Sequence, residues 1–271
     1  MLYNAAVQQE VLRGLSVTLG YYHRRYHDMF WTDNLATTHG DYSIIPIVDP
    51  RGNGQTVDVY SLNRAKFGLV NQFVTNSNEN SRTYHGLDLS FMARLGIGAQ
   101  LQGGVNSGKT RISDCQTDDP NNLRFCDRSY GFRTQFKLSG SVPLPYRFRM
   151  SGVFSSLPGQ LSDREGDFTG LDLPITYTVT PAIAAGLTQP SVNLLLSAPD
   201  EYTLNRSNQL DIAFARDFTV SGVRLRPQVD FFNALNTNAV IRAITAYGPA
   251  LLSPREILAA RLIRLNLRMD F

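Results

Sequence analysis

The two cysteines of the chain, Cys115 and Cys126, lie in one polar segment, Asp114-Cys-Gln-Thr-Asp-Asp-Pro-Asn-Asn-Leu-Arg-Phe-Cys126. An exported loop meets an oxidising environment, where two thiols this close form a disulfide that stabilises the fold by roughly 3 kcal/mol. In a cytosolic chain the same residues would stay unpaired thiols. The sequence therefore predicts a Cys115–Cys126 disulfide if the chain is exported.

Metal binding is the other chemistry that these residues could support. Zinc is a poor fit, since no Cys-x-x-Cys pair or histidine cluster accompanies the cysteines. The nearby carboxylates lack the regular spacing and the glycine of a calcium loop, so we expect them to form a solvated turn: Asp114, Asp118, Asp119 and Asp127.

Histidine spacing gives no metal site either. His23 and His27 are four residues apart, which on a strand separates them by about 13 Å, too far to share one ion. His39 and His85 are isolated in the sequence, and we interpret all four histidines as ordinary polar residues.

Catalytic signatures do not stand out. There is no Ser-His-Asp order, nucleophile elbow or acidic catalytic pair, and Gly96-Ile-Gly98 lies in a turn with no helix after it, unlike a nucleotide-binding loop. The net charge of +3 is small for 271 residues and gives no reason to expect a nucleic-acid partner. We predict that the chain is not an enzyme and carries no cofactor.

Alternating polarity is the strongest structural pattern in the sequence. In residues 132 to 142, apolar or small side chains alternate with polar ones that include Arg133 and Lys137. Burying two cations in a dry core would be costly, so the polar face needs water. Residues 223 to 231 repeat the pattern with Arg224, Arg226 and Asp230 on the polar side and Pro227 as an awkward residue for a strand.

This period of two predicts nine strands, most of them about ten residues long, which suits tilted membrane strands better than average soluble ones. Their predicted ranges are 3 to 12, 15 to 26, 84 to 95, 97 to 106, 132 to 142, 147 to 156, 204 to 217, 223 to 231 and the terminal Leu265-Asn-Leu-Arg-Met-Asp-Phe271.

The predicted connections alternate strictly between short and long, as in bacterial outer-membrane barrels with short periplasmic turns and long external loops. The long ones span approximately 32 to 82, 109 to 131, 157 to 203 and 234 to 259. The predicted fold class is thus all-β, an antiparallel transmembrane β-barrel segment whose carboxyl terminus is periplasmic.

No run approaches the roughly 18 apolar residues of a spanning helix, and the first ten residues lack the features of a secretory signal. Aromatic residues gather near predicted strand ends, as in the interfacial girdles of a barrel: Tyr21, Tyr22, Tyr26, Phe30 and Trp31 at external ends, with Tyr146 and Phe271 at periplasmic ends. Since antiparallel closure requires an even number of strands, nine strands are expected to be part of a larger barrel.

Six segments and the terminal strand together resemble the carboxyl-terminal barrel portion of TonB-dependent outer-membrane receptors, particularly the Oar-like type with a carboxypeptidase-regulatory-like domain at its front. The segments are Val70-Asn-Gln-Phe-Val-Thr-Asn76, Arg82-Thr-Tyr-His-Gly-Leu-Asp-Leu89, Leu101-Gln-Gly-Gly-Val105, Asn208-Gln-Leu-Asp211, Val229-Asp-Phe-Phe-Asn-Ala-Leu-Asn236 and Pro254-Arg-Glu-Ile-Leu-Ala-Ala-Arg261. The resemblance implies that residues 1 to 271 supply the last nine of about 22 strands around a plugged lumen, without the signal peptide, front domain or plug.

The family's activity would be active uptake of a large or scarce ligand across the outer membrane, energised by the TonB complex through the plug region, with lipid and the barrel-assembly machinery as further partners. On this reading the polar faces line the lumen, including Arg133, Lys137, Arg224, Arg226 and Asp230. The last strand resembles a barrel-assembly signal carried by Leu265, Leu267, Met269 and Phe271.

Two alternatives share part of this pattern. A passive porin-like barrel would have the same strands without a plug, and a soluble secreted β-sandwich of lectin or adhesin type would pack two sheets against each other. The ligand stays open among iron chelates, cobalamin, glycans and peptides.

Overall fold

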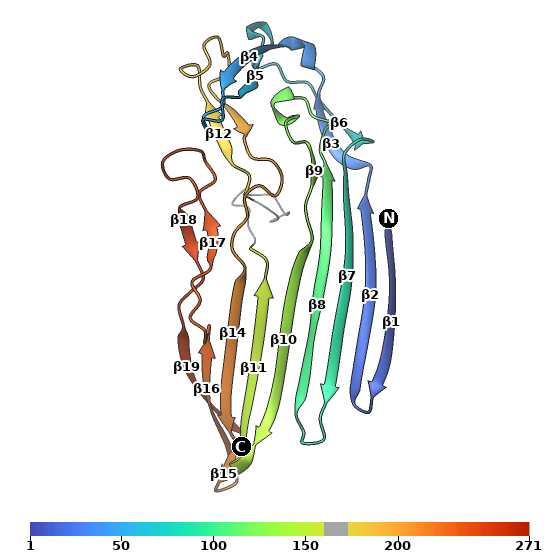
Figure 1. Cartoon of the computed structure of the whole chain (residues 1–271), viewed down its shortest axis with the longest axis vertical. Coiled ribbons are helices and arrows are strands. Elements are labelled where there is room, and N and C mark those ends of the chain that lie inside the picture. Colours follow the sequence, from blue (N-terminus) through green and yellow to red (C-terminus); the bar gives the residue numbers. More distant parts are fainter. Residues whose placement is uncertain (160–172, 271) are drawn as a thin grey trace.

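Nine long antiparallel strands form one tall sheet in the computed structural model, which describes residues 1–159 and 173–270 (Figure 1). Each long strand pairs with the next one along the chain. Their bounds are β1 (Leu2–Leu12), β2 (Leu15–Tyr26), β7 (Ser81–Arg94), β8 (Gln100–Ser113), β10 (Arg133–Leu144), β11 (Phe148–Leu157), β14 (Ser207–Arg216), β16 (Val223–Phe232) and β19 (Leu262–Asp270). The all-β antiparallel fold and the nine long strands are confirmed.

Two short strands complete this sheet to eleven among the described residues: β9 (Asp127–Ser129) beside β8 and β15 (Phe218–Val220) beside β16. The long strands lie in a single layer and do not form the two packed sheets expected of a β-sandwich. No helix in residues 1–159 and 173–270 is long and apolar enough to cross a membrane.

The register gathers the apolar side chains on one face of the sheet. One row across five strands is entirely apolar, and the row one residue along is polar or glycine over seven strands. The apolar row is Val7, Leu19, Leu89, Val105 and Phe136, and the polar row is Gln8, Thr18, Ser90, Gly104, Lys137, Ser155 and Gln209. We refer to these two surfaces as the apolar face and the polar face.

Tight connections join the strands at one end of the sheet, where the carboxyl terminus also lies in Figure 1. The β1–β2 turn is Arg13-Gly14, and Gly14 has a φ of 79°. A Cβ atom at Gly14 would lie 2.6 Å from the carbonyl oxygen of Arg94, so both the backbone angle and the close approach require glycine.

Pro227 explains where β16 leaves β14. The pairing of these two strands ends at Ala215 and Gln228, while β16 continues past the proline with β19, pairing Pro227 with Leu267. Proline has no N–H to donate to a second neighbour, so a strand that contains it is tolerated where one ladder stops.

The boundaries of β8 were predicted wrongly. It begins at Gln100, three residues later than expected, and continues to Ser113, so the loop predicted from residue 109 starts at 114. The apolar alternation fades beyond Val105, but pairing with β7 and β9 continues because the backbone hydrogen bonds of a ladder do not depend on side-chain polarity.

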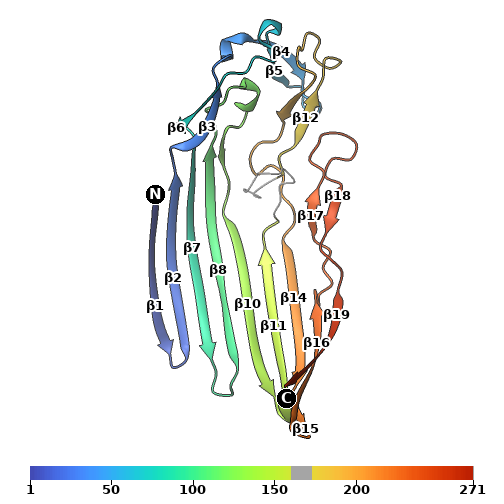
Figure 2. The ribbon, with the colours of Figure 1, turned by 180° about the vertical axis from the view of Figure 1, so that it is seen from behind.

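The long connections contain strands of their own, which gather at the other end of the sheet (Figures 1 and 2). The pairs are β3 (Met29–Asn34) with β6 (Gln72–Ser77), β4 (Tyr42–Val48) with β5 (Thr56–Leu62), β12 (Thr176–Val179) with β13 (Val192–Leu195) and β17 (Val240–Ala243) with β18 (Pro254–Ile257). Four 3-10 turns are described as well: η1 (His39–Asp41), η2 (Arg64–Lys66), η3 (Pro120–Asn122) and η4 (Pro145–Arg147).

The main buried cluster lies in these loops, and the long strands contribute nothing to it. It is formed by β4, β5 and the β12–β13 segment, and its members are Ile47, Val57, Val59, Val179, Ala184, Leu187, Val192 and Leu194. By contrast, Leu89 on the apolar face is about half exposed. A soluble protein buries its apolar strand face, so the distribution here indicates that lipid or another protein surface covers that face.

Candidate functional site

The polar face brings together all five charged residues expected to line a lumen. Lys137 is aligned with Ser155 and Gln209, and through β14 this face continues to Asp230 on β16. Arg133 lies on the same side of β10 as Lys137, and Arg224 and Arg226 lie on the same side of β16 as Asp230. That this shared face borders a lumen stays a prediction.

Asp230 is the most buried acid of this face and links the last two strands. Its carboxylate accepts hydrogen bonds from Gln228 on its own strand (2.6 Å), Arg264 (2.9 Å) and Asn266 (2.6 Å), both on β19. Arg264 and Asn266 are functional neighbours that the sequence analysis missed, because alternation gives each side chain a face but does not give the register between strands.

Arg133 and Arg226 are also engaged. Arg133 forms an ion pair with Asp200 in the β11–β14 loop, so the polar face is tied directly to a long connection. Arg226 pairs with Asp217 in the turn between β14 and β15. Hollows of about 630 Å³ and 440 Å³ lie mainly along this face, the larger beside Lys137 and the smaller beside Asp230.

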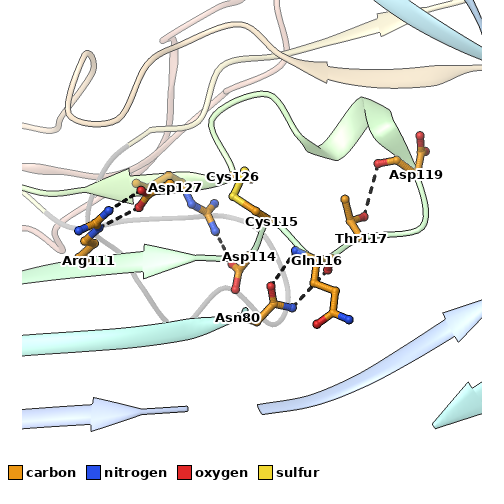
Figure 3. The surroundings of a disulfide bond; sticks show 10 residues. Asn80, Arg111, Asp114, Cys115, Gln116, Thr117, Asp119, Cys126 and Asp127 are labelled. Atoms are coloured by element: carbon orange, nitrogen blue, oxygen red, sulfur yellow. Dashed lines mark hydrogen bonds and ion pairs between the residues drawn. A yellow bond between two sulfur atoms is a disulfide. The ribbon is translucent and has the colours of Figure 1, made fainter. Parts of the chain in front are cut away.

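The disulfide loop connects β8 to β10. The structure joins Cys115 to Cys126 by a disulfide (Figure 3). The backbone N–H of Asp114 donates to the carbonyl of Cys126 (2.9 Å). Asn80, in the β6–β7 connection, binds this loop through its side-chain amide. The amide oxygen accepts a hydrogen bond from the Gln116 N–H (2.9 Å), and the amide nitrogen donates one to the Gln116 carbonyl (3.2 Å).

The four acidic residues of this segment have four different partners. Asp114 pairs with Arg128 (2.6 Å), Asp127 with Arg111 (2.6 Å), Asp118 accepts from the backbone of Asn34 and Asp119 accepts from the backbone of Asn121. They stabilise the loop and its junction with β3.

Asn121 connects the disulfide loop to strand β5. Its side-chain oxygen accepts from Tyr60 N–H and its side-chain amide donates to the Tyr60 carbonyl, both at 2.8 Å. The amide thus pairs with the edge of β5 as another strand would. We call the unit formed by β4, β5, β12, β13 and the disulfide loop the loop cap.

Replacing Cys115 and Cys126 by serine should destabilise the loop cap by about 3 kcal/mol, because the unfolded loop regains its freedom. The measurement is the rate of proteolytic cleavage between residues 114 and 132. It is compared between the double variant and the wild type under reducing and non-reducing conditions. Equal cleavage rates for the oxidised wild type and the double variant would contradict the prediction.

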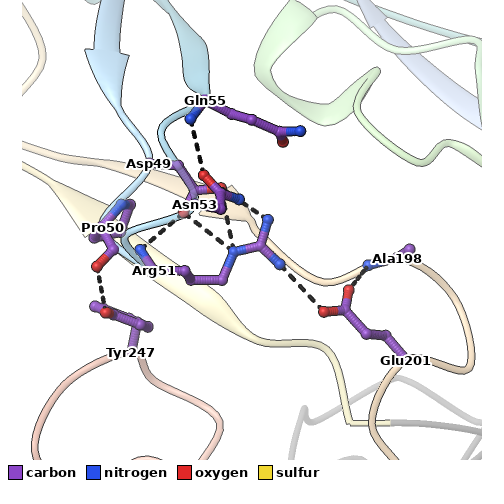
Figure 4. A network of polar contacts seen from close by, with 8 residues as sticks. All are labelled: Asp49, Pro50, Arg51, Asn53, Gln55, Ala198, Glu201 and Tyr247. Carbon is purple, nitrogen blue, oxygen red and sulfur yellow. Dashed lines mark hydrogen bonds and ion pairs between the residues drawn. The ribbon is translucent and has the colours of Figure 1, made fainter.

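A second network holds the β4–β5 turn to the β13–β14 segment. The Asp49 side chain is fully buried and is held by the guanidinium and backbone of Arg51 and by Asn53, while Arg51 also reaches Glu201 (3.3 Å), as shown in Figure 4. These hydrogen bonds lower the pKa of Asp49 to about 2, against the opposing effect of burial. Tyr247 completes the network by donating to the carbonyl of Pro50.

The lowered pKa gives the loop cap a defined acid sensitivity. Asp49 has an ordinary pKa of 3.8, so its stabilising effect is complete above about pH 4 and is lost as the pH falls through about 2. We expect Arg51→Gln to weaken the loop cap at neutral pH and to flatten this acid-dependent loss, because the pKa of Asp49 then returns toward 3.8. Hydrogen exchange of β4 and β5 measures both effects.

Asp58→Asn is the matched control for Arg51→Gln, since Asp58 is an exposed carboxylate on the same hairpin. It should leave the acid profile of the wild type unchanged. A wild-type profile that is flat between about pH 4 and 2 would show that Asp49 does not stabilise the fold.

A pocket of about 330 Å³ opens between β3, η1 and the disulfide loop. Trp31, Asp33 and Asp118 line it with His39, whose ring lies 2.7 Å from the Thr117 carbonyl. Burial and the neighbouring carboxyl of Asp33 raise the pKa of Asp118. The pocket therefore offers an aromatic ring beside a carboxyl pair, in the part of the chain where long loops meet.

His85 is isolated in the sequence but not in the fold. It lies opposite His23 across the β2–β7 ladder, with their Nδ1 atoms 3.1 Å apart. The two histidines are 62 residues apart in sequence, so only the strand pairing brings them together.

The terminal strand presents Leu265, Leu267 and Met269 on the apolar face, opposite Val229, Pro227 and Leu225 of β16. All three are highly exposed. Phe271, the remaining residue of the expected assembly signal, lies outside the described residues, and the assembly role stays a prediction.

Comparison with known proteins gives one structural likeness to report. No family model matches the chain, and no curated protein sequence matches it. The outer membrane transporter YddB from Escherichia coli is similar in structure, with a TM-score of 0.50 and 11% sequence identity over 100% of this chain and 32% of the transporter chain. This chain thus spans about a third of that protein and shares its fold.

Proposed function

We propose that this chain is the wall segment of an outer-membrane transport barrel that takes up a ligand actively, with energy from the TonB complex. The observation that carries the proposal is the strand register, which places an apolar row across five strands on one side of the sheet and the charged residues Lys137 and Asp230 on the other. Lipid would cover the first face and a hydrated lumen the second.

The loops fit the external end of such a barrel. The Cys115–Cys126 disulfide crosslinks one of them, and such a bond persists in an oxidising exterior. The loops also pack around a hydrophobic core of their own. The structural likeness to an outer membrane transporter supports the transport role. The assignment to TonB-dependent receptors of Oar-like type rests on the sequence segments described above.

In this role the chain would bind the ligand at its loops and guide it along the lumen. The loop cap and its pocket would contact the incoming ligand, and the polar face would contact whatever occupies the lumen. Leu265, Leu267 and Met269 would be read by the barrel-assembly machinery before lipid covers them.

Uptake by cells tests the active mechanism. A strain lacking the gene and the same strain with the gene restored are supplied in turn with radiolabelled ferric chelates, cobalamin, oligosaccharides and peptides. The proposal predicts that the gene restores accumulation of one class and that a protonophore abolishes it. Gene-dependent accumulation that survives the protonophore would instead identify a passive pore.

A further inference from the structure

A cluster of cations interrupts the apolar face near the loop end of β2, β7 and β8. The register aligns His23, His85 and Lys109 across the three strands, and the row two residues further along aligns Arg25, Thr83 and Arg111. We call His23, His85, Lys109, Arg25 and Arg111 the basic band.

The basic band belongs to the apolar face and not to the polar one. Strand residues of the same parity share a face, and His23 is four residues from Leu19 on β2, just as His85 is four residues from Leu89 on β7. At about 3.3 Å per residue, the band lies roughly 13 Å along the strands from that apolar row. Across the same three strands, Tyr21, Leu87 and Ser107 form the row between them.

The charge of the band is largely unpaired. Arg111 is held by Asp127 through two hydrogen bonds of 2.9 and 2.6 Å, which leaves three of its five N–H donors for another acceptor. In the described part of the chain, neither Lys109 nor Arg25 forms a salt bridge, and both side chains are exposed. Three cations thus face one carboxylate.

Neighbouring aromatic rings contact the two histidines of the band. The hydroxyl of Tyr21 lies 3.3 Å from Nδ1 of His85, and the rings of Tyr3 and His23 stack with centroids 5.9 Å apart. Lys109 is paired with His85 in the β7–β8 register, so the two imidazoles and the lysine lie in one row across the three strands.

We propose that the basic band binds the phosphate groups of an anionic lipid in the outer leaflet of the membrane. The inference rests on the proposed function, because it needs the apolar face to be covered by lipid. Lipid headgroups lie where the apolar surface of a membrane protein ends, and clustered lysines and arginines at that level attract anionic headgroups. The width of three strands, about 10 Å between the outer two, suits a phosphorylated headgroup.

The test compares two lipids on the full chain. The protein is reconstituted in phosphatidylcholine nanodiscs that contain equal amounts of bisphosphorylated lipid A and of the same lipid with its phosphates removed. Lipids that stay bound are counted by native mass spectrometry. We expect the phosphorylated form to predominate by about 25-fold, at roughly fivefold for each of the two cations that form no salt bridge.

Two variants locate the binding site. Arg25→Gln combined with Lys109→Gln should lower the preference about 25-fold, whereas Lys137→Gln, which removes a lysine of the polar face, should leave it unchanged. Equal binding of the two lipids by the wild type, or equal losses in both variants, would overturn the inference.

The wild-type comparison does not depend on the variants folding. A chain that inserts into the bilayer but shows no preference for phosphate overturns this inference alone. A chain that stays outside the bilayer overturns the proposed function as well. Displacement of the bound lipid by free inorganic phosphate would show a site for the soluble ion and would also contradict the proposal.

Discussion

Leu89→Arg should lower the free energy of unfolding of the membrane-inserted chain by about 2–4 kcal/mol, the cost of a cation on the lipid face near the midplane of a barrel. Leu89 lies in the middle of an apolar row between Leu19 and Val105 and is about half exposed. An arginine there would face hydrocarbon with no acidic partner in the same row.

Ser90→Arg is the matched control, one residue along the same strand. Ser90 aligns with Thr18 and Gly104 on the polar face, where water surrounds a new cation. Urea unfolding of both variants in lipid vesicles gives the comparison. Equal destabilisation by the two substitutions would contradict the assignment of the faces.

Leu194→Ala should destabilise the loop cap by about 2–5 kcal/mol, the usual cost of truncating a buried leucine. Leu194 is 1% exposed and packs with Val57 and Val59 of β5 and with Val179 of β12. The long strands do not contribute to this cluster, so the variant should still insert into membranes. Hydrogen exchange is expected to rise in β4, β5, β12 and β13 and to stay low in β7 and β8.

Ile44→Ala removes an apolar side chain from the exposed surface of the same unit, since Ile44 is 57% exposed on β4. It should change the stability of the loop cap by less than about 0.5 kcal/mol. If Leu194→Ala instead accelerated exchange throughout the long strands, the cap and the sheet would be one cooperative unit.

The long strands could be predicted because their side chains follow a simple chemical pattern. A wall between lipid and water needs strict alternation, and residues such as Phe136 and Lys137 show it without any knowledge of their neighbours. Half of the strand order follows as well, since the tight connections place β1 beside β2, β7 beside β8, β10 beside β11 and β14 beside β16.

The loop cap could not be predicted in this way. Its strands are four to seven residues long, and its contacts join segments far apart in sequence, such as Tyr60 with Asn121 and Arg51 with Glu201. Neither periodicity nor turn residues encode such pairings, because one asparagine amide in a polar loop looks like any other until the backbone edge it binds is known.

The same limit applies to the candidate sites. Alternation placed Asp230 on the polar face, but Arg264 and Asn266 became its partners only through the β16–β19 register. The His23–His85 pair depends in the same way on the β2–β7 ladder. A shift of one residue in either register would have moved these side chains to opposite faces.

Spin labels on adjacent residues test the central claim, that one face of the sheet contacts lipid and the other contacts water. Leu89→Cys and Ser90→Cys are labelled separately in the reconstituted chain, and their collisions with oxygen and with a water-soluble nickel complex are measured. The label at 89 should be accessible to oxygen and shielded from nickel, and the label at 90 should show the reverse. Two labels with the same accessibility would contradict a membrane wall.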